Sequence, residues 1–210
     1  MKTLIVSATY NELSTLIKKL SLKKETDNFY ISDNFDILIS GIGNAFTIYN
    51  LTEHLNKYTY KLIINVGIAG TFNKKICLGD IVSVKSDCFA DIGIDDNGIF
   101  YTLEEAGLIS NKLKIKFASD LITKEIIKVE AITVNTASGS ADKIYKLVNK
   151  FKPDIETMEG ASVAFVANNK SVPVIQIRAI SNYVEPRNKA NWNINLAINN
   201  LNSFLITSFK

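Results

Sequence analysis

Short apolar runs alternate along the chain with segments in which apolar residues recur every three or four positions. The helical spacing predicts helices at residues 11–20, 44–57, 139–149, 160–169 and 195–209. The apolar runs predict strands at residues 4–8, 36–40, 61–66, 80–84, 131–135 and 174–180. These runs lack strict alternation of apolar and polar residues, which is typical of strands covered on both faces. The pattern therefore predicts an α/β fold, a three-layer α/β/α domain with a mixed, mainly parallel central sheet.

The length of 210 residues fits one domain spanning residues 1–210, and no linker or internal repeat divides it. The least regular stretch is 92–128, where Asp-Asp-Asn-Gly at 95–98 predicts a turn. We expect a small hairpin or excursion in this stretch.

Charge and hydropathy exclude several classes of partner. The net charge is +3, and the lysines are scattered rather than gathered in a basic stripe, so we expect no nucleic acid partner. No apolar run reaches the length of a membrane span, and the first apolar run is too short for a signal peptide. We therefore expect a cytoplasmic protein with no membrane partner.

Residues that could carry metal or histidine chemistry are sparse. Cys77 and Cys88 have no histidine near them, so we expect no metal and no cofactor. The only histidine, His54, falls on a predicted helix and is expected to be a surface or packing residue. This leaves carboxylates, arginine, amides and backbone groups to carry any chemistry.

An unusual set of side chains follows the last predicted strand. The segment 176–192 holds both arginines, Arg178 and Arg187, and the single tryptophan, Trp192, in a chain that otherwise uses lysine. Arginine is hard to replace where a planar, permanently charged, bidentate donor is needed. The segment is therefore expected to belong to a site.

Five segments at predicted strand ends carry polar or glycine residues. Ligands of open α/β sheets bind at the carboxyl ends of the strands, so these segments are expected to meet. Two glutamates, Glu12 and Glu159, could instead be helix-capping carboxylates, and the glycine pairs could be simple tight turns. The five segments are 10–12, 41–43, 67–70, 157–160 and 178–187.

Taken together, these residues resemble the nucleoside phosphorylase and nucleosidase family of the uridine/purine phosphorylase type. The resemblance spans nearly the whole chain. Two segments, 89–93 and 181–188, are similar to the futalosine hydrolase branch of that family; a better-known relative is methylthioadenosine/adenosylhomocysteine nucleosidase. The matching motifs are Ser-Ala-(x)₃-Glu at 7–12, Ser-Gly-Ile-Gly at 40–43, Asn-Val-Gly-Ile-Ala-Gly at 65–70, Leu-Gly-Asp-Ile-Val at 78–82, Met-Glu-Gly-Ala at 158–161 and Ile-Arg-Ala-Ile-Ser at 177–181.

The resemblance implies a hydrolase that cleaves the N-glycosidic bond of futalosine, releasing hypoxanthine and dehypoxanthine futalosine in menaquinone biosynthesis. It implies that Glu12 activates water, that Glu159 binds the ribose hydroxyls and that Arg178 positions the water or the carboxylates. Substrate-binding roles are implied for Met158 beneath the sugar, for Ala69 and Gly70 in a turn lining the sugar and base, and for Asn135 beside the base.

Asn182 stands where the adenine-specific nucleosidases of the family carry an aspartate. An amide can donate to O6 or N7 of a 6-oxopurine, whereas a carboxylate facing O6 would oppose two acceptors. Asn182 is therefore expected to favour hypoxanthine as the leaving base and to stabilise the charge that develops on it. The alternative is an asparagine that bonds the backbone of its own loop.

Arg187 is expected to bind the carboxylate of the benzoate-bearing extension of futalosine. The alternative is a loop arginine paired with Glu185 or with a neighbouring subunit. The resemblance implies a homodimer or higher homo-oligomer, with Phe89 and Tyr101 as aromatic candidates for completing the pocket. Three other functions stay open: a phosphorolytic enzyme, a methylthioadenosine/adenosylhomocysteine nucleosidase and a non-catalytic nucleoside-binding protein.

Overall fold

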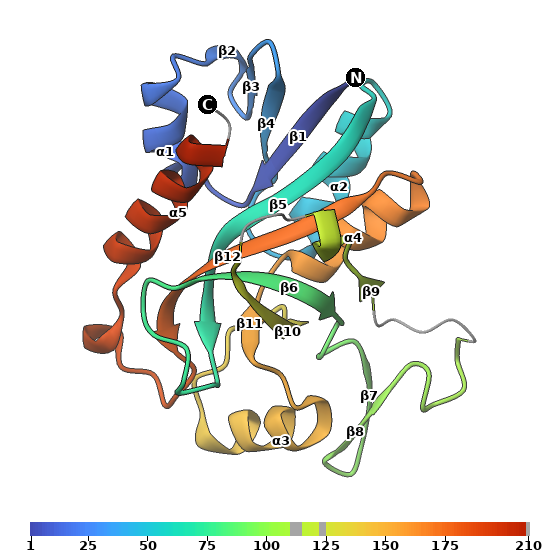
Figure 1. Ribbon diagram of the computed structural model, residues 1–210. Helices are drawn as coiled ribbons and strands as arrows, with labels where there is room; N and C mark the ends of the chain where they lie inside the picture. Colours follow the sequence, from blue (N-terminus) through green and yellow to red (C-terminus); the bar gives the residue numbers. More distant parts are fainter. Residues whose placement is uncertain (110–114, 122–124, 209–210) are drawn as a thin grey trace.

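The computed structural model of the chain describes residues 1–109, 115–121 and 125–208. A twisted sheet occupies the centre, and helices cover both of its faces (Figure 1). The helices are α1 (Tyr10–Lys19), α2 (Asn44–Leu55), α3 (Ala141–Phe151), α4 (Gly160–Asn169) and α5 (Ile194–Ser208). The strands are β1 (Lys2–Ser7), β2 (Lys23–Thr26), β3 (Phe29–Ile31), β4 (Phe35–Ile39), β5 (Tyr60–Thr71), β6 (Ile81–Asp87), β7 (Gly93–Asp96), β8 (Ile99–Thr102), β9 (Ile115–Lys116), β10 (Ile127–Thr133), β11 (Ile155–Thr157) and β12 (Val174–Tyr183).

The central sheet has the order β11-β10-β6-β12-β5-β1-β4-β3-β2, with β9 paired to β6. Its inner pairs β12–β5, β5–β1 and β1–β4 are parallel, whereas β6 runs antiparallel to β12. β11 also pairs antiparallel with the end of β5, so the sheet curls back on itself there. The predicted α/β fold with a mixed central sheet is confirmed.

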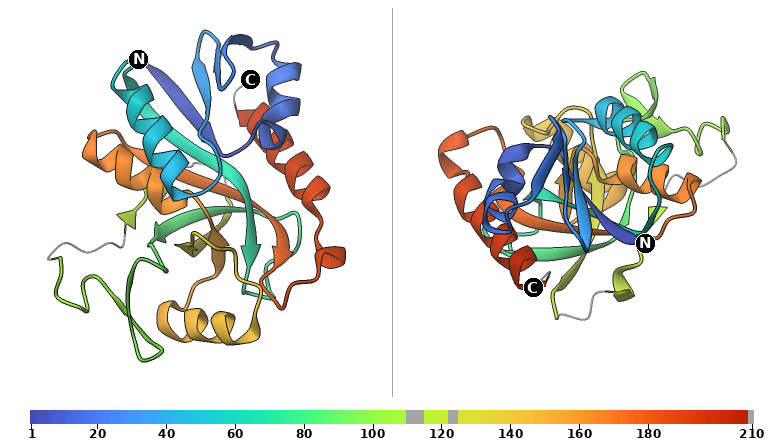
Figure 2. Two further views of the ribbon diagram at one scale, coloured as in Figure 1. Left: turned by 180° about the vertical axis from the view of Figure 1, so that it is seen from behind. Right: turned by 90° about the horizontal axis from the view of Figure 1, so that it is seen from above.

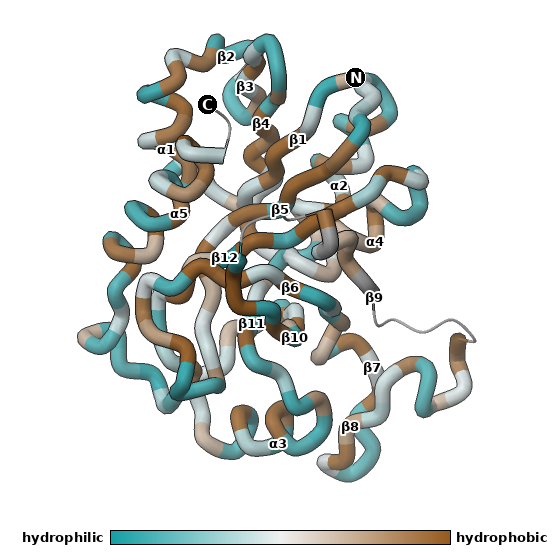
Figure 3. The backbone as a smooth tube through the Cα atoms, viewed as in Figure 1, coloured by the Kyte–Doolittle hydropathy of each residue, from teal (hydrophilic) through white to brown (hydrophobic). Residues whose placement is uncertain are grey.

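Three apolar clusters fill the spaces between the sheet and the helices, the smallest of them beneath α3. α1 and α5 cover one face and α2 and α4 the other, as two turned views show (Figure 2). Leu13 and Leu16 of α1 and Leu201 of α5 are fully buried against the first face. The most hydrophobic residues follow the central strands (Figure 3). Both faces of these strands are covered, which explains why apolar and polar residues do not alternate along them.

Several boundaries differ from the prediction. The strand predicted at 61–66 continues to Thr71, so the glycine turn expected at 67–70 is wrong: these residues are part of β5. The last strand likewise runs on to Tyr183 rather than ending at residue 180. β2, β3 and β11 were not predicted, because β2 is exposed throughout and the other two have only three residues each. The end of the predicted helix 195–209 falls outside the described residues.

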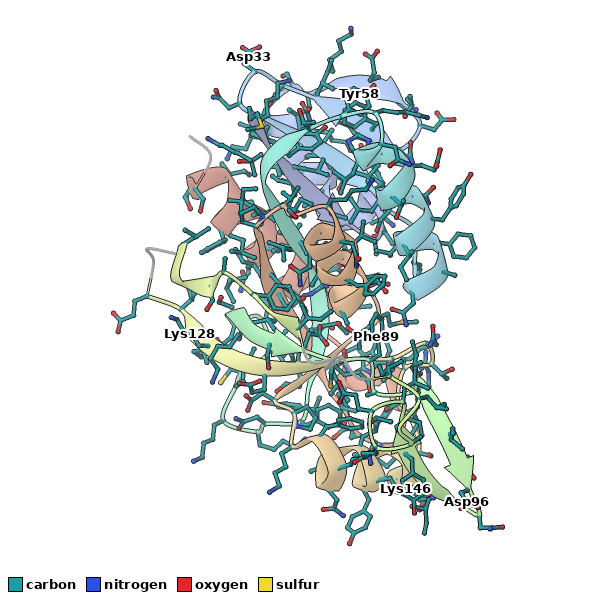
Figure 4. All side chains as sticks on the ribbon, turned by 90° about the vertical axis from the view of Figure 1, so that its right-hand side faces the viewer. Asp33, Tyr58, Phe89, Asp96, Lys128 and Lys146 are labelled. Atoms are coloured by element: carbon teal, nitrogen blue, oxygen red, sulfur yellow. The ribbon has the colours of Figure 1, made fainter. Side chains whose placement is uncertain are left out.

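The expected excursion is partly described. β7 and β8 form a two-stranded antiparallel hairpin that turns at Asn97 and Gly98, which both have positive φ. The hairpin projects from the body of the molecule, with Asp96 near its tip (Figure 4). The turn predicted at 95–98 is confirmed, and the rest of 92–128 lies partly outside the described residues.

No helix within the described ranges is both long enough and apolar enough to cross a membrane. Over the same residues, no group of three or more histidine, cysteine, aspartate or glutamate side chains is placed to hold a metal ion.

Candidate active site

A cavity of about 730 Å³ opens at the carboxyl ends of the central strands. All five segments singled out in the sequence contribute to its wall. The predicted site residues in the wall are Glu12, Ala69, Gly70, Met158, Glu159 and Asn182. β5 and β12 run farther than predicted and supply several of these residues. Side chains that were expected on loops are therefore held on rigid strands.

Glu12 is buried at the start of α1, and four donors hold its carboxylate. Oε2 accepts hydrogen bonds from Ser7 Oγ at 2.9 Å, from Thr9 N at 3.0 Å and from Thr9 Oγ1 at 3.1 Å. Oε1 accepts from Ile68 N of β5 at 3.0 Å. The bond from Thr9 N completes a capping box. Glu12 therefore both caps α1, as the alternative interpretation predicts, and lines the cavity.

Glu159 lies at the other side of the cavity, at the N-cap position of α4. Its Oε1 accepts a hydrogen bond from Gly43 N at 2.8 Å, which ties it to the turn before α2. Burial raises the pKa of the Glu159 carboxyl, and the charge of Arg178 opposes that shift. Glu159 thus occupies the N-cap position, but its carboxylate makes no hydrogen bond to the first turn of α4, so the alternative of a capping carboxylate is not supported.

Arg178 is fully buried behind the cavity wall rather than in it. Its Nη2 donates to Asn65 Oδ1 of the neighbouring strand. Burial lowers the pKa of the guanidinium, while the carboxylates of Glu159, Glu12 and Asp87 oppose that shift. The positive charge of Arg178 therefore acts on both cavity carboxylates from behind the wall.

Gly67 makes this arrangement possible. A Cβ at this position would collide with Arg178 Nη1 and would lie 2.8 Å from Glu12 Oε1. Both charged groups thus converge on the same point of β5, where only a glycine leaves room for them.

Asp87 is a fully buried carboxylate at the end of β6 that the sequence did not reveal. Both of its oxygens accept from Thr133 Oγ1 at 3.0 Å, and Thr133 Oγ1 accepts from Ala161 N at the start of α4. Burial raises the pKa of Asp87 to about 6, against the opposing effects of the Thr133 hydrogen bond and the Arg178 charge. This network ties Asp87, whose charge acts on Arg178, to the first turn of α4, next to Glu159.

Asn182 is half-buried in the cavity wall, and its amide has a defined orientation. Its Nδ2 donates to the carbonyl oxygen of Tyr183 at 3.0 Å, and its Oδ1 accepts from Ser181 Oγ at 2.8 Å. Asn182 therefore makes the hydrogen bond to the backbone of its own segment that the alternative interpretation predicts. The amide retains a second N–H and a further lone pair for a ligand.

Four predicted substrate-binding residues, Phe89, Asn135, Tyr101 and Arg187, lie outside this cavity wall. Phe89, labelled in Figure 4, is buried in the core, with its ring 6.5 Å from that of Phe165. Asn135 is exposed and donates to Asp91 through its backbone N at 2.6 Å and through Nδ2 at 3.0 Å. Tyr101, on the projecting hairpin, is 37% exposed.

Arg187 lines a second hollow, of about 470 Å³, which shares Trp192, Ile194 and Asn195 with the main cavity. Its guanidinium lies over the Trp192 ring at 5.1 Å from the ring centre. Glu185, its expected partner in the alternative interpretation, instead bonds Lys74 at 3.4 Å and Asn191 at 2.9 Å. Trp192 thus separates the two hollows, a role the sequence did not show.

Glu156 and Ser138 are among the wall residues that sequence reasoning missed. Both line the cavity, and Glu156 is buried. The strand that holds Glu156 has only three residues, so its alternating pattern of core and cavity side chains is too short to detect.

The chain has clear relatives among known proteins. Residues 4–209 match the family described as the phosphorylase superfamily. The 5'-methylthioadenosine/S-adenosylhomocysteine nucleosidase of Buchnera aphidicola subsp. Baizongia pistaciae is 26% identical over 97% of this chain and 86% of its own length. The futalosine hydrolase of Streptomyces coelicolor is 28% identical over 80% of this chain and 75% of its own length.

A solved structure has the same fold. It is a mutant of the Helicobacter pylori nucleosidase MTAN with 5'-methylthioadenosine in the active site, and it superimposes with a TM-score of 0.84 at 18% identity. The alignment covers 98% of this chain and 96% of that one.

Proposed function

We propose that this chain, which belongs to the phosphorylase superfamily and is a nucleosidase that hydrolyses an N-glycosidic bond, acts on futalosine and releases hypoxanthine. Relatives named for methylthioadenosine and for futalosine have similar identity to this chain, so identity alone does not assign the base that is released. The assignment is therefore argued from the residues of the cavity. The observation that carries the proposal is the orientation of the Asn182 amide.

The backbone around Asn182 favours an amide over a carboxylate. The carbonyl oxygen of Tyr183 accepts from Nδ2, so an ionised aspartate would place an oxygen against that carbonyl oxygen. Leaving such a pair of acceptors opposed costs about 1–3 kcal/mol. The second N–H of the amide can donate to O6 or N7 of a 6-oxopurine, which an aspartate could not do.

The cavity wall favours water over phosphate as the nucleophile. Among the described residues that form it are three glutamates and no lysine or arginine. A phosphate ion would meet like charge there without a cationic partner, which is unfavourable in a partly enclosed site. We therefore propose hydrolysis rather than phosphorolysis.

In the proposed reaction Glu12 is the general base. It takes a proton from water as the water oxygen bonds to C1′ of the ribose and the bond from C1′ to N9 breaks. The bonding electrons leave with hypoxanthine, and Asn182 stabilises the charge by donating to O6 or N7. Glu159 binds the ribose hydroxyls above Met158, and Arg178 holds the two carboxylates from behind.

The second hollow supports the proposed role of Arg187. Futalosine carries a carboxylate beyond its 5′ carbon, and the hollow is adjacent to the main cavity, with Trp192 lining both. Stacking on Trp192 restrains the guanidinium and leaves its N–H groups free to bind a carboxylate in bidentate fashion.

We also propose that the protein is a homo-oligomer. Three large apolar side chains, Ile42 in the turn before α2 and Phe46 and Tyr49 on α2, are 57%, 65% and 68% exposed. Ile42 also lines the cavity, so a partner subunit covering these side chains would also close the site. Light scattering of the purified protein tests this, and a monomeric mass would contradict it.

The base assignment is tested with Asn182→Asp. We expect the variant to lose activity on inosine-type substrates and to gain relative to the wild type on adenosine-type substrates. The ratio of the two kcat/KM values should shift by about tenfold or more. An unchanged ratio in a folded variant would remove Asn182 from base selection.

A further inference from the structure

Glu156 is a buried cavity carboxylate to which the proposed reaction gives no role. It is 8% exposed and lies on β11, where it lines the cavity together with Thr157. The preceding residue, Ile155, is fully buried in the apolar core, as alternation along a strand predicts for neighbours of a cavity residue. A carboxylate is costly to bury, so one that lines a ligand cavity requires an explanation.

Glu156 and Asn182 flank the same glycine. Glu156 pairs with Gly70 from β11, and Asn182 pairs with Gly70 from β12 on the other side of β5. Neighbouring strands are about 4.8 Å apart, which places the two backbones about 10 Å apart across the cavity wall. Gly70 has no side chain to fill the space between them. A Cβ there would lie 3.0 Å from Asn182 Nδ2.

The Glu156 carboxylate is fixed but not saturated. Oε1 accepts from Ser138 N at 2.8 Å, and Oε2 accepts from Ser138 Oγ at 2.5 Å. A carboxylate has about four acceptor sites, so about two remain for a ligand. Burial raises the pKa of Glu156, and the two Ser138 hydrogen bonds and the charge of Lys143 oppose this shift.

Building on the proposed function, we propose that Glu156 accepts the N1–H of the 6-oxopurine while Asn182 donates to O6 or N7 of the same base. A 6-oxopurine presents an acceptor at O6 next to a donor at N1. The amide on one side of Gly70 and the carboxylate on the other offer a donor and an acceptor, which match this edge.

The same pair of side chains is a poor match to adenine. Adenine presents a donor at N6 and an unprotonated acceptor at N1, which is the reverse order. The Glu156 carboxylate would then face the N1 lone pair, and the amide N–H would face an amine. A buried acceptor left without a donor weakens binding about tenfold or more. Glu156 therefore discriminates at N1, an atom that Asn182 does not contact.

A purely structural role for Glu156 predicts a different outcome. In that case the carboxylate would only tie the Ser138 segment to β11. Glu156→Gln keeps an acceptor for Ser138 N and an amide that can bond Ser138 Oγ, so the tie would persist. Ser138→Ala is the matched control, because it loses one hydrogen bond of the tie and keeps the carboxylate.

The test is the binding of free bases to the wild type, to Glu156→Gln and to Ser138→Ala, by calorimetry or competitive inhibition. The bases are hypoxanthine, 1-methylhypoxanthine, which lacks the N1–H, and adenine. We expect the wild type to bind hypoxanthine about tenfold or more tightly than the other two. Glu156→Gln should bind hypoxanthine about tenfold more weakly than the wild type does, and its preference for hypoxanthine over adenine should become smaller. Ser138→Ala should keep the wild-type preference.

Two results would overturn the inference. The first is that Glu156→Gln binds hypoxanthine as tightly as the wild type does. The second is that Glu156→Gln loses affinity equally for all three bases. Release of hypoxanthine from futalosine by the wild type is measured alongside. Release without dependence of base binding on Glu156 would leave the proposed function standing and remove the role of Glu156. Dependence on Glu156 without release would retain that role and remove futalosine as substrate.

Discussion

Gly67 lies where Glu12 and Arg178 converge on β5, so Gly67→Ala should displace both side chains without removing any polar group. The added Cβ would collide with Arg178 Nη1 and lie 2.8 Å from Glu12 Oε1. Restoring an ordinary contact of 3.4 Å requires Glu12 Oε1 to retreat by about 0.6 Å (3.4 minus 2.8), and the guanidinium to move farther. Neither group is free to move, because Glu12 accepts four hydrogen bonds and Arg178 is buried.

The size of the effect follows from this geometry. Overpacking a rigid interior costs about 1–3 kcal/mol, which lowers the melting temperature of a chain of this length by about 2–12 °C. Misplacing a reacting group by about 1 Å costs about 10²-fold in rate. We therefore expect kcat to fall about 10²-fold while the variant remains folded.

The assay measures hypoxanthine release at saturating substrate, together with thermal unfolding. Gly139→Ala is the matched control, because its Cβ would lie 3.4 Å from Arg187 Cβ, an ordinary contact. The control should keep nearly wild-type kcat. If Gly67→Ala also kept wild-type kcat and melting temperature, the convergence of Glu12 and Arg178 on β5 would be refuted.

Two further predictions concern residues away from the reacting centre. Arg187→Ala should raise KM for futalosine about tenfold or more and leave KM unchanged for an analogue without the carboxylate; equal effects on both substrates would contradict carboxylate binding. Burial lowers the pKa of His54 to about 4, and the charge of Asp36 opposes this shift. Because the unfolded chain binds the proton near pH 6.5, the free energy of unfolding should fall as pH drops from 6.5 to 4, by up to about 1.4 kcal/mol per unit from this group. In His54→Phe, which keeps an aromatic ring beside Tyr58 and Tyr60, that part of the slope in urea unfolding should disappear, and an unchanged slope would exclude His54 as its source.

The sequence predicted the layered fold because long apolar strands and amphipathic helices carry their own periodicity. It also predicted that Glu12, Glu159 and Asn182 would meet, since strand ends of one sheet lie at one edge. It did not predict that β5 runs through Gly67 and Gly70, because glycine usually interrupts a strand. Here the glycines leave room for Arg178, Glu12 and Asn182, contacts that only the assembled sheet creates.

Other parts of the site depend on contacts between segments distant in the sequence. Asp87 and Glu156 are ordinary acidic residues in the sequence, and only burial beside Thr133 and Ser138 distinguishes them. Trp192 could be seen as unusual, but its position between the two hollows results from the path of the chain into α5.

The most direct test of the central claim is base release by the wild-type protein from futalosine and from methylthioadenosine, each with and without phosphate. We expect hypoxanthine release from futalosine that needs no phosphate, with a kcat/KM about tenfold or more above that for adenine release. A higher kcat/KM for methylthioadenosine, or release that requires phosphate, would contradict the proposed function.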